Sequence, residues 1–274
     1  MGILKQKIGR KKPPFKLDKF IILPTGVTKM PYMKSVCKAG CTRMIWRYYT
    51  RTAQPRKKRS PKKNENTDAQ KKVNDRQLER KLTALLNANF NGECWYITFD
   101  YDPKKRPQTI AELKNHENKL LRELRKIYKK QGLILKYIWT AEVGPRGGAH
   151  IHMVVSPIDA RLLRDVWPYG WTTIKPLDKS GQYSRLASYF IKYYQKTRGT
   201  DAAIQSRSYC PSKNLTRPAF EKKRMKGNCF GLEVKVPKGW YLDKQAFGDS
   251  GIQYGITDDG YEYMYYILVK ETIP

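Results

Sequence analysis

Negative charge is scarce in this sequence. Its 274 residues include 24 Asp and Glu against 55 Lys and Arg, which gives a formal net charge of +31 at pH 7. A chain with so few acidic side chains attracts polyanions, and nucleic acid is the first candidate. A ribosomal or membrane-surface role is the alternative. The 12% of aromatic and 40% of hydrophobic residues argue against a mere basic tail.

Regularly spaced cysteines and long apolar runs are also missing. The five cysteines are odd in number and scattered, and no signal peptide precedes them, so we expect free thiols in a reducing, cytoplasmic setting. Cys37 and Cys41 alone make a poor half-site for zinc. Apolar runs are short, so we expect no membrane-spanning segment and no membrane partner. The motif G-x-x-x-x-G-K-[ST] does not occur, which excludes a fused helicase of the Walker type.

Composition divides the chain into three parts. Residues 1–72 form a basic N-terminal extension and linker, residues 73–206 a central domain, and residues 207–274 a β-rich C-terminal extension with a hairpin around residues 258–260. The positive charge of the linker is densest in one cluster, made of Arg56, Lys57, Lys58 and Arg59. Such a segment is either a disordered, solvated linker or an arm that binds phosphates, and both hold if it orders on nucleic acid.

The central domain alternates segments of strand and helix periodicity. A capping box at Thr109 and Glu112 begins the clearest helix, and Gly132 can end it. After a first helix at 74–88, we expect strand, helix, strand, strand, helix, strand and helix at residues 94–101, 109–132, 136–143, 149–155, 157–167, 171–175 and 184–196. This order predicts an α+β fold. We expect a ferredoxin-like (RRM-like), mainly antiparallel sheet with helices on one face, which leaves the other face free for a site.

Two of the three histidines lie one residue apart in an apolar strand. His150 and His152 share a face, because successive side chains of a strand point to opposite sides. Two neutral imidazoles on a rigid strand are a good start to a divalent-metal site, although this spacing alone is weak evidence. Glu142 ends the preceding strand, and a hairpin would bring it beside His150 as a third ligand; the alternative is a solvated loop carboxylate. This donor set suits Mn²⁺ or Mg²⁺ better than a closed zinc site. We interpret His116, in the middle of a helix, as a surface residue.

The last helix of the central domain has one apolar face and one face of tyrosines and cations. At about 100° per residue, the second face carries Arg185, Tyr189, Lys192, Tyr193 and Lys196. An ordinary amphipathic edge with cation–π contacts is the alternative interpretation. A tyrosine hydroxyl has an unperturbed pKa near 10, so it attacks phosphorus only when positive charge helps it ionise and the phosphate is polarised. The histidine strand would supply the metal, and Lys192 the charge.

These motifs resemble those of the HUH endonucleases, the initiators of rolling-circle replication. The resemblance covers about residues 94–197, and more loosely extends to residue 218. The segment His150-Ile151-His152 resembles the histidine motif, and Tyr189-x-x-Lys192-Tyr193-x-x-Lys196 resembles the two-tyrosine form of the microvirus type. The run from Ser208 to Pro218 is similar to a segment in replication-associated proteins of Gram-positive plasmids and integrative elements.

The resemblance implies a metal-dependent enzyme that nicks one strand of origin DNA. Tyr189 would form a 5′-phosphotyrosine and release a 3′-OH that primes synthesis, with Tyr193 as a second nucleophile and Lys192 orienting the phosphate. Glu142, His150 and His152 would hold Mn²⁺ or Mg²⁺. The residues expected to contact DNA are Arg56, Lys57, Lys58, Arg59, Arg146, Arg185 and Lys196. The expected partners are origin DNA, a host helicase and the replication machinery, in the cytoplasm of a bacterial host. The alternatives are an HUH transposase or relaxase with the same chemistry, or a non-catalytic basic nucleic-acid-binding module.

Overall fold

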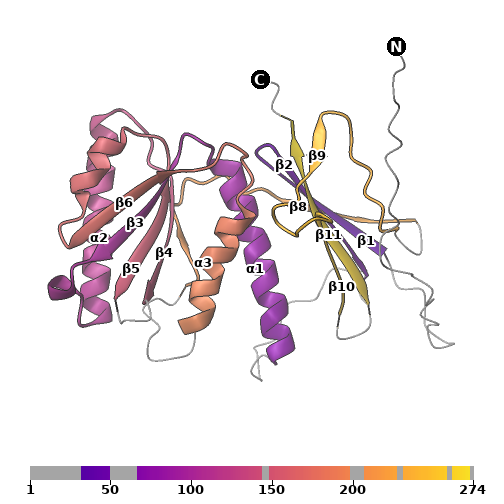
Figure 1. Cartoon of the computed structure of the whole chain (residues 1–274), viewed down its shortest axis with the longest axis horizontal. Helices are drawn as coiled ribbons and strands as arrows, with labels where there is room; N and C mark the ends of the chain where they lie inside the picture. The colour runs from indigo at the N-terminus through magenta and orange to yellow at the C-terminus, as the bar shows by residue number, and fades with distance from the viewer. Residues whose placement is uncertain are drawn as a thin grey trace, which may run out of the picture.

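Two antiparallel sheets enclose a pair of helices in the fold of this chain. The computed structural model describes residues 32–49, 67–143, 148–197, 207–226, 231–257 and 261–271. Figure 1 shows the layers in order: α2, the first sheet, α3 with α1, and the second sheet. The elements are β1 Tyr32–Ala39, β2 Thr42–Tyr49, α1 Asp68–Asn89, β3 Trp95–Tyr101, η1 Pro103–Lys105, α2 Ile110–Lys130, β4 Tyr137–Val143, β5 Ala149–Val155, η2 Ala160–Val166, β6 Gly170–Pro176, α3 Ser184–Thr197, β7 Cys210–Pro211, β8 Phe220–Arg224, β9 Trp240–Leu242, β10 Ile252–Ile256 and β11 Glu262–Lys270.

The first sheet has the strand order β6-β3-β5-β4-β7, and every pairing in it is antiparallel. The chain runs through β3, α2, β4, β5, η2 and β6, which gives the ferredoxin-like arrangement. Ile97 and Phe99 of β3 pack with Leu120 and Leu124 of α2 in one buried cluster. The predicted α+β class with an antiparallel sheet is therefore confirmed.

Helices cover both faces of this sheet, whereas we expected them on one face. The crossover elements α2 and η2 pack on the expected face, but α1 and α3 pack on the other. The reason lies in β4 and β5, which carry apolar side chains on both faces toward one end. Ile138 and Val154 point away from α2 and are buried against Leu86 of α1 and Phe190 of α3. The face with the histidines is thus open only in part.

The second sheet combines strands from the two ends of the chain. Its order is β10-β11-β2-β1-β8, with β9 also paired to β11. We treated residues 1–72 and 207–274 as two separate extensions, yet β2 pairs with β11 and β1 pairs with β8. Residues 32–49 showed no clear period in the sequence because both faces of this sheet are covered, so its strands need apolar side chains on both sides. The expected hairpin is confirmed as β10 and β11.

Helix α1 joins the two sheets through a close contact with the β1–β2 turn. Gly40 has a φ of +56°, and a Cβ at this position would lie 2.1 Å from the carbonyl oxygen of Asn87. The buried Asn87 side chain donates to the Thr42 hydroxyl at 3.0 Å and accepts from the backbone N–H of Tyr183 at 2.9 Å. One amide therefore holds together β2, α1 and the segment that leads into α3.

Two helical segments differ from the sequence prediction, one in where it begins and one in its type. Helix α1 begins earlier than expected, because the Thr67 side chain caps it by accepting from the Gln70 N–H. The segment expected as a helix at 157–167 is the 3₁₀-helix η2, capped by Asp159. The hydroxyl of Ser156, just before η2, donates to the carbonyl of Ile134.

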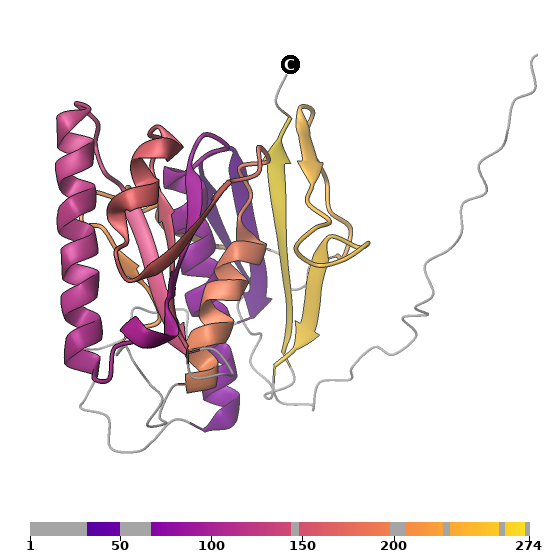
Figure 2. The ribbon, with the colours of Figure 1, turned by 60° about the vertical axis from the view of Figure 1, so that its left-hand side comes forward.

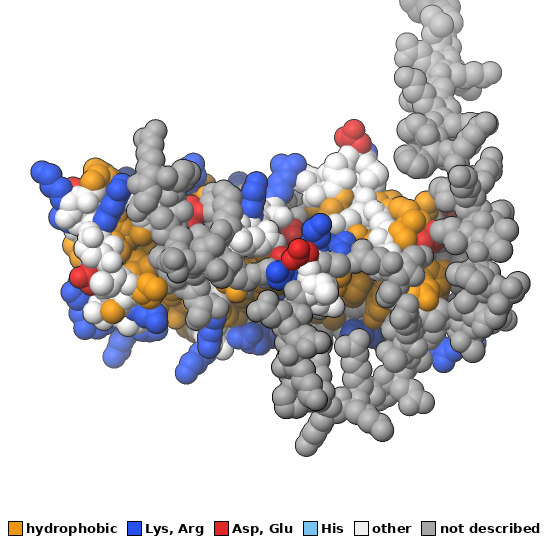
Figure 3. All heavy atoms as spheres, turned by 90° about the horizontal axis from the view of Figure 1, so that it is seen from below, with side chains coloured by type: hydrophobic (Ala, Val, Ile, Leu, Met, Phe, Trp, Pro, Cys, Tyr) orange, Lys and Arg blue, Asp and Glu red, His pale blue; other side chains and the backbone are white. Residues whose placement is uncertain are grey.

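The four cysteines in the described ranges are free thiols, as expected. Among the described helices, none combines the length and hydrophobicity needed to cross a bilayer. On the described part of the face that is seen from below, Lys and Arg side chains stand at scattered places, with fewer Asp and Glu (Figure 3).

Candidate active site

Two rows of polar side chains cross the first sheet on the face away from α2. In one row, Glu142 of β4 and Asp100 of β3 are both register partners of His150 on β5. In the next row, Thr140 and Thr98 flank His152 in the same way. Register partners share a face, so the strand alternation alone gathers these groups. The predicted β4–β5 hairpin therefore pairs Glu142 with His150, as expected.

His152 is the buried centre of this cluster, with 4% of its surface exposed. Its Nε2 lies 2.8 Å from Oε1 of Glu142, and its Nδ1 lies 2.8 Å from the Tyr96 hydroxyl and 3.2 Å from the Thr98 hydroxyl. A carboxylate only accepts hydrogen bonds, so Nε2 of His152 donates to Glu142, while Nδ1 faces the hydroxyls of Tyr96 and Thr98. The carboxylate of Glu142 thus bonds His152, although its backbone is paired with His150.

A second carboxylate, that of Asp100 on the neighbouring strand β3, orients the ring of His150. Its Nδ1 lies 2.5 Å from Oδ1 of Asp100, and the side chains are 33% and 30% exposed respectively. Because Nδ1 is held, Nε2 is the nitrogen left to face the surface. The rings of His150 and His152 are 6.4 Å apart.

Helix α3 places Tyr189 against this cluster. Ala187, Phe190 and Ile191 are buried under the helix, and this fixes its rotation. The ring of Tyr189 stands edge-on to that of His152, with 5.4 Å between centroids and 82° between planes, and 36% of the residue is exposed. The exposed Lys192 follows one turn later. The fold therefore brings Tyr189 next to His152, although about forty residues separate the histidines from the tyrosine in the sequence.

The remaining predicted site residues fall into two groups. Arg185 is exposed, and its Nε donates to the carbonyl of Gln245 at 2.9 Å, so it contacts the segment after β9. The others lie outside the described residues or have side chains outside them, and these are Arg56, Lys57, Lys58, Arg59, Arg146, Tyr193 and Lys196.

The donor chemistry of the cluster fits a divalent cation. Oε2 of Glu142 is buried and has no hydrogen-bond partner in the described structure, which leaves a carboxylate oxygen available to a ligand. His152 places an imidazole nitrogen against this carboxylate, and His150 is its register partner on β5. The described side chains nevertheless contain no ready-made group of three His, Cys, Asp or Glu around one point. An ion bound here would replace the hydrogen bond between His152 and Glu142.

Residues 94–198 match the model of the family described as Replication-associated protein ORF2/G2P. The match begins just before β3 and ends after α3, so it contains Glu142, His150, His152 and Tyr189. It spans well under half of the chain and includes neither α1 nor the second sheet. No curated protein and no solved structure matches the chain. The ORF2/G2P match thus relates the part of the chain that carries the candidate site to replication-associated proteins.

Several residues of the ORF2/G2P segment beside the site were not assigned a role from the sequence. Tyr96, Thr98 and Asp100 lie in the strand expected at residues 94–101, and their spacing of two is the signal that they share the histidine face. Arg106 is a second case. A Cβ on Gly148 would lie 3.2 Å from Nη2 of Arg106 and 3.5 Å from Nε2 of His150, so both groups border one small space.

His116 was interpreted as a surface residue, and the structure corrects this. It is half-buried on α2, its ring stacks on Tyr169 at 3.7 Å, and its Nδ1 lies 3.0 Å from the Tyr101 hydroxyl. Burial lowers the pKa of His116. It belongs to the α2 face of the sheet, away from the candidate site.

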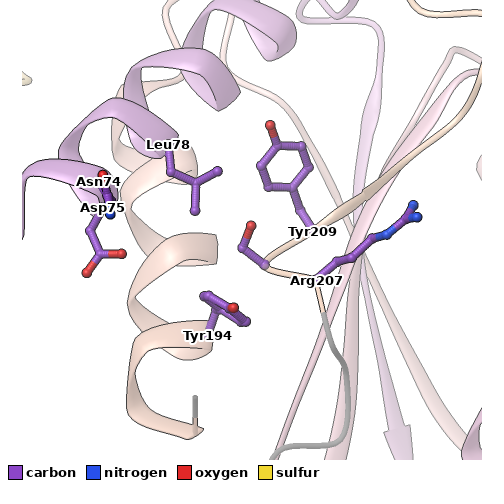
Figure 4. A pocket seen from close by; sticks show the side chains of 7 residues that line it. Asn74, Asp75, Leu78, Tyr194, Arg207 and Tyr209 are labelled. Carbon is purple, nitrogen blue, oxygen red and sulfur yellow. The ribbon is translucent and has the colours of Figure 1, made fainter. Parts of the chain in front are cut away.

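A pocket of about 490 Å³ lies between α1, α3 and the segment before β7. Its lining residues are Asn74, Asp75, Leu78, Tyr194, Arg207, Ser208 and Tyr209 (Figure 4). The Ser208 carbonyl accepts a hydrogen bond from the Thr140 hydroxyl at 3.2 Å, so this segment closes the β4 side of the candidate site. Two tyrosines of α3 therefore lie on different sides, with Tyr189 at the histidines and Tyr194 in the pocket.

Proposed function

We propose that this protein nicks and rejoins single-stranded DNA at a replication origin through a covalent 5′-phosphotyrosine, and so initiates rolling-circle replication. The observation that carries the proposal is the ring of Tyr189 beside His152, which is itself bonded to Glu142. Tyr189, two imidazoles and a carboxylate oxygen that has no partner among the described residues lie together at one partly open place. The family match and the net charge of +31 support DNA as the substrate.

In the proposed reaction the Tyr189 oxygen attacks the scissile phosphorus. A bond forms between that oxygen and phosphorus, the bond from phosphorus to the 3′-oxygen breaks, and the 3′-oxygen takes a proton to become a 3′-OH. The phenol proton leaves to solvent, and the cation of Lys192, one turn along α3, favours this loss. His150, His152 and Glu142 would hold a divalent ion, Mn²⁺ or Mg²⁺. When bound, it would draw charge from the phosphate oxygens.

Rejoining is the reverse reaction with a different 3′-OH. That hydroxyl attacks the phosphotyrosine, the link to the tyrosine oxygen breaks, and an intact strand is restored. We propose Tyr193 as the nucleophile of a second cleavage that ends a round of replication. We propose that a helicase of the host unwinds the duplex.

Covalent capture tests the proposal without knowledge of the origin. The protein is incubated with a pool of random single-stranded DNA and Mn²⁺, then denatured, and the DNA that stays attached is sequenced. We expect adducts with one preferred junction. The Tyr189→Phe variant should give none, because the ring remains but the hydroxyl is gone. Chelation of the metal should abolish adducts, and added Mn²⁺ or Mg²⁺ should restore them.

Tyr194→Phe is the matched control, since it removes a hydroxyl from the same helix on its other side. It should form adducts as the wild type does. If Tyr193→Phe abolishes adducts and Tyr189→Phe keeps them, the two tyrosines exchange roles. Absence of any adduct with the wild type overturns the proposal and favours a non-catalytic nucleic-acid-binding protein.

A further inference from the structure

The edge strand β6 exposes three side chains in a line on the histidine face. Trp171, Thr173 and Lys175 alternate with residues that face α2, and all three are exposed. Trp171 has 60% of its surface exposed. A tryptophan offers a large, flat apolar face on which another ring can stack.

The register of the sheet places this line beside the candidate site. Trp171 is the register partner of Asp100, which holds His150, and Thr173 is the partner of Thr98, which contacts His152. Neighbouring strands lie about 4.8 Å apart, so Trp171 stands roughly 10 Å from His150 across the sheet. The exposed line therefore continues the polar rows of the site.

Among the described residues, protein covers two other approaches to the site. On the β4 side, β7 pairs with the strand and the Ser208 carbonyl bonds Thr140. Toward one end of the face, α1 and α3 bury Ile138 and Val154. Among the described residues, β6 has no strand on its outer side, and Figure 2 shows it in the foreground as the edge strand of its sheet. A substrate chain that reaches Tyr189 can leave the site over β6.

We propose that β6 is the track for the single strand that flanks the scissile phosphate, with one base stacked on Trp171. This inference rests on the proposed function, because it takes DNA as the substrate. Aromatic stacking with nearby cations is how proteins hold single strands without reading their sequence. Lys175 supplies a cation at one end of the line, and Arg106 supplies another near His150. In a duplex the base faces are already stacked on one another, so Trp171 selects single strands.

Fluorescence anisotropy with labelled oligo-dT tests the track apart from chemistry. All proteins carry Tyr189→Phe, and no divalent metal is added, so binding alone is measured. We expect Trp171→Ala to weaken binding by about 5- to 150-fold, the range for loss of one stacked base. Trp171→Phe should retain most of the affinity, because a ring remains. Affinity for a duplex should be the same with and without Trp171.

Tyr241→Ala is the matched control, since Tyr241 is another exposed aromatic residue, 42% exposed, on β9 of the second sheet. It should bind oligo-dT as the parent does. Lys175→Gln should lower the slope of log affinity against log salt by about 0.7, the value for one phosphate contact on a single strand. Equal losses for Trp171→Ala on single strands and on duplex would overturn the stacking role, and so would no loss at all.

The outcome separates this inference from the proposed nicking activity. If wild-type protein forms covalent adducts while Trp171→Ala binds oligo-dT normally, the track is wrong and the activity stands. If no adduct ever forms but Trp171→Ala loses single-strand binding, the track stands and the nicking activity is wrong.

Discussion

Asp100 acts on the candidate site only through His150. Its carboxylate holds Nδ1 of that ring and so aims Nε2 toward the surface. Partners of this kind commonly change metal affinity or activity by about 10- to 100-fold when removed. We therefore expect Asp100→Ala to shift the Mn²⁺ dependence of adduct formation to about 10- to 100-fold higher concentration.

The control for Asp100 is Asp165→Ala, which removes an exposed carboxylate from η2 on the far face of the sheet. It should leave the Mn²⁺ titration unchanged. An unchanged titration for Asp100→Ala as well would show that the ring of His150 needs no such support, or that His150 is not a ligand.

Glu117 is a buried carboxyl on α2 whose burial raises its pKa to about 7. In the unfolded chain the pKa is near 4.5, so between these two values the folded state binds the extra proton. Stability therefore falls as pH rises from about 4.5 to about 7, by up to about 3 kcal/mol. We expect Glu117→Gln, which cannot ionise, to be more stable than the wild type at pH 8 and to lose this advantage near pH 5.

Urea denaturation at the two pH values measures the effect of Glu117. Glu123→Gln is the control on the same helix, because Glu123 lies at the surface beside Lys126. Its stability difference from the wild type should not grow with pH in this way. A Glu117→Gln difference that is independent of pH would contradict the raised pKa.

At the scale of elements, α1 is fixed to the second sheet by a buried cation between two rings. The guanidinium carbon of Arg80 lies 4.4 Å from the ring of Trp46 on β2 and 4.5 Å from that of Tyr265 on β11. The Arg80 side chain is 8% exposed, and burial lowers its pKa. A flat guanidinium can lie on both rings, whereas a compact ammonium cannot and loses more hydration.

We accordingly expect Arg80→Lys to lower the free energy of unfolding by about 1–2 kcal/mol. Lys81→Ala, at the exposed neighbouring position of α1, should change it by less than about 0.5 kcal/mol. Equilibrium urea unfolding compares the two variants. Equal stability of Arg80→Lys and the wild type would mean that the positive charge between the two rings stabilises the fold, and that the planar shape of the guanidinium does not contribute.

The elements also show what the sequence can and cannot predict. The two faces of α3 were predictable because helical period separates Phe190 from Tyr189, and the polar face of β5 followed from alternation. Strands β1 and β2 were not, since burial on both faces removes the alternation. The bond between Glu142 and His152 was not predictable either, because register fixes backbone partners but not side-chain rotamers.

At the scale of the whole molecule, one dense cluster of positive charge lies apart in sequence from the candidate site. The cluster of Arg56, Lys57, Lys58 and Arg59 lies between β2 and α1 in sequence, outside the family match. Replacing all four with Gln should lower the salt slope for single-strand binding by up to about 3, because each phosphate contact contributes about 0.7. The rate of adduct formation at saturating DNA should stay the same. A lower rate at saturation would place the cluster in the catalytic step.

The second sheet contacts α1 closely at the β1–β2 turn. Gly40 has a left-handed φ of +56°, and a Cβ there would overlap the Asn87 carbonyl oxygen. Gly40→Ala should therefore push the turn away from α1 and strain the bonds from Asn87 to Thr42 and to Tyr183, the residue before α3. We expect a loss of at least about 2 kcal/mol in unfolding free energy.

The same change tests whether the candidate site depends on the second sheet. Because Asn87 also holds the segment that leads into Tyr189, Gly40→Ala should lower adduct formation at temperatures where the wild type is fully folded. Gly132→Ala is the matched control, since Gly132 also has a positive φ, +67°, but a Cβ there meets nothing within 4 Å. Gly132→Ala should lose only the stability that an alanine costs at a positive φ, and it should form adducts as the wild type does. Equal adduct yields for Gly40→Ala and Gly132→Ala would show that the contact between the β1–β2 turn and α1 does not affect the position of α3.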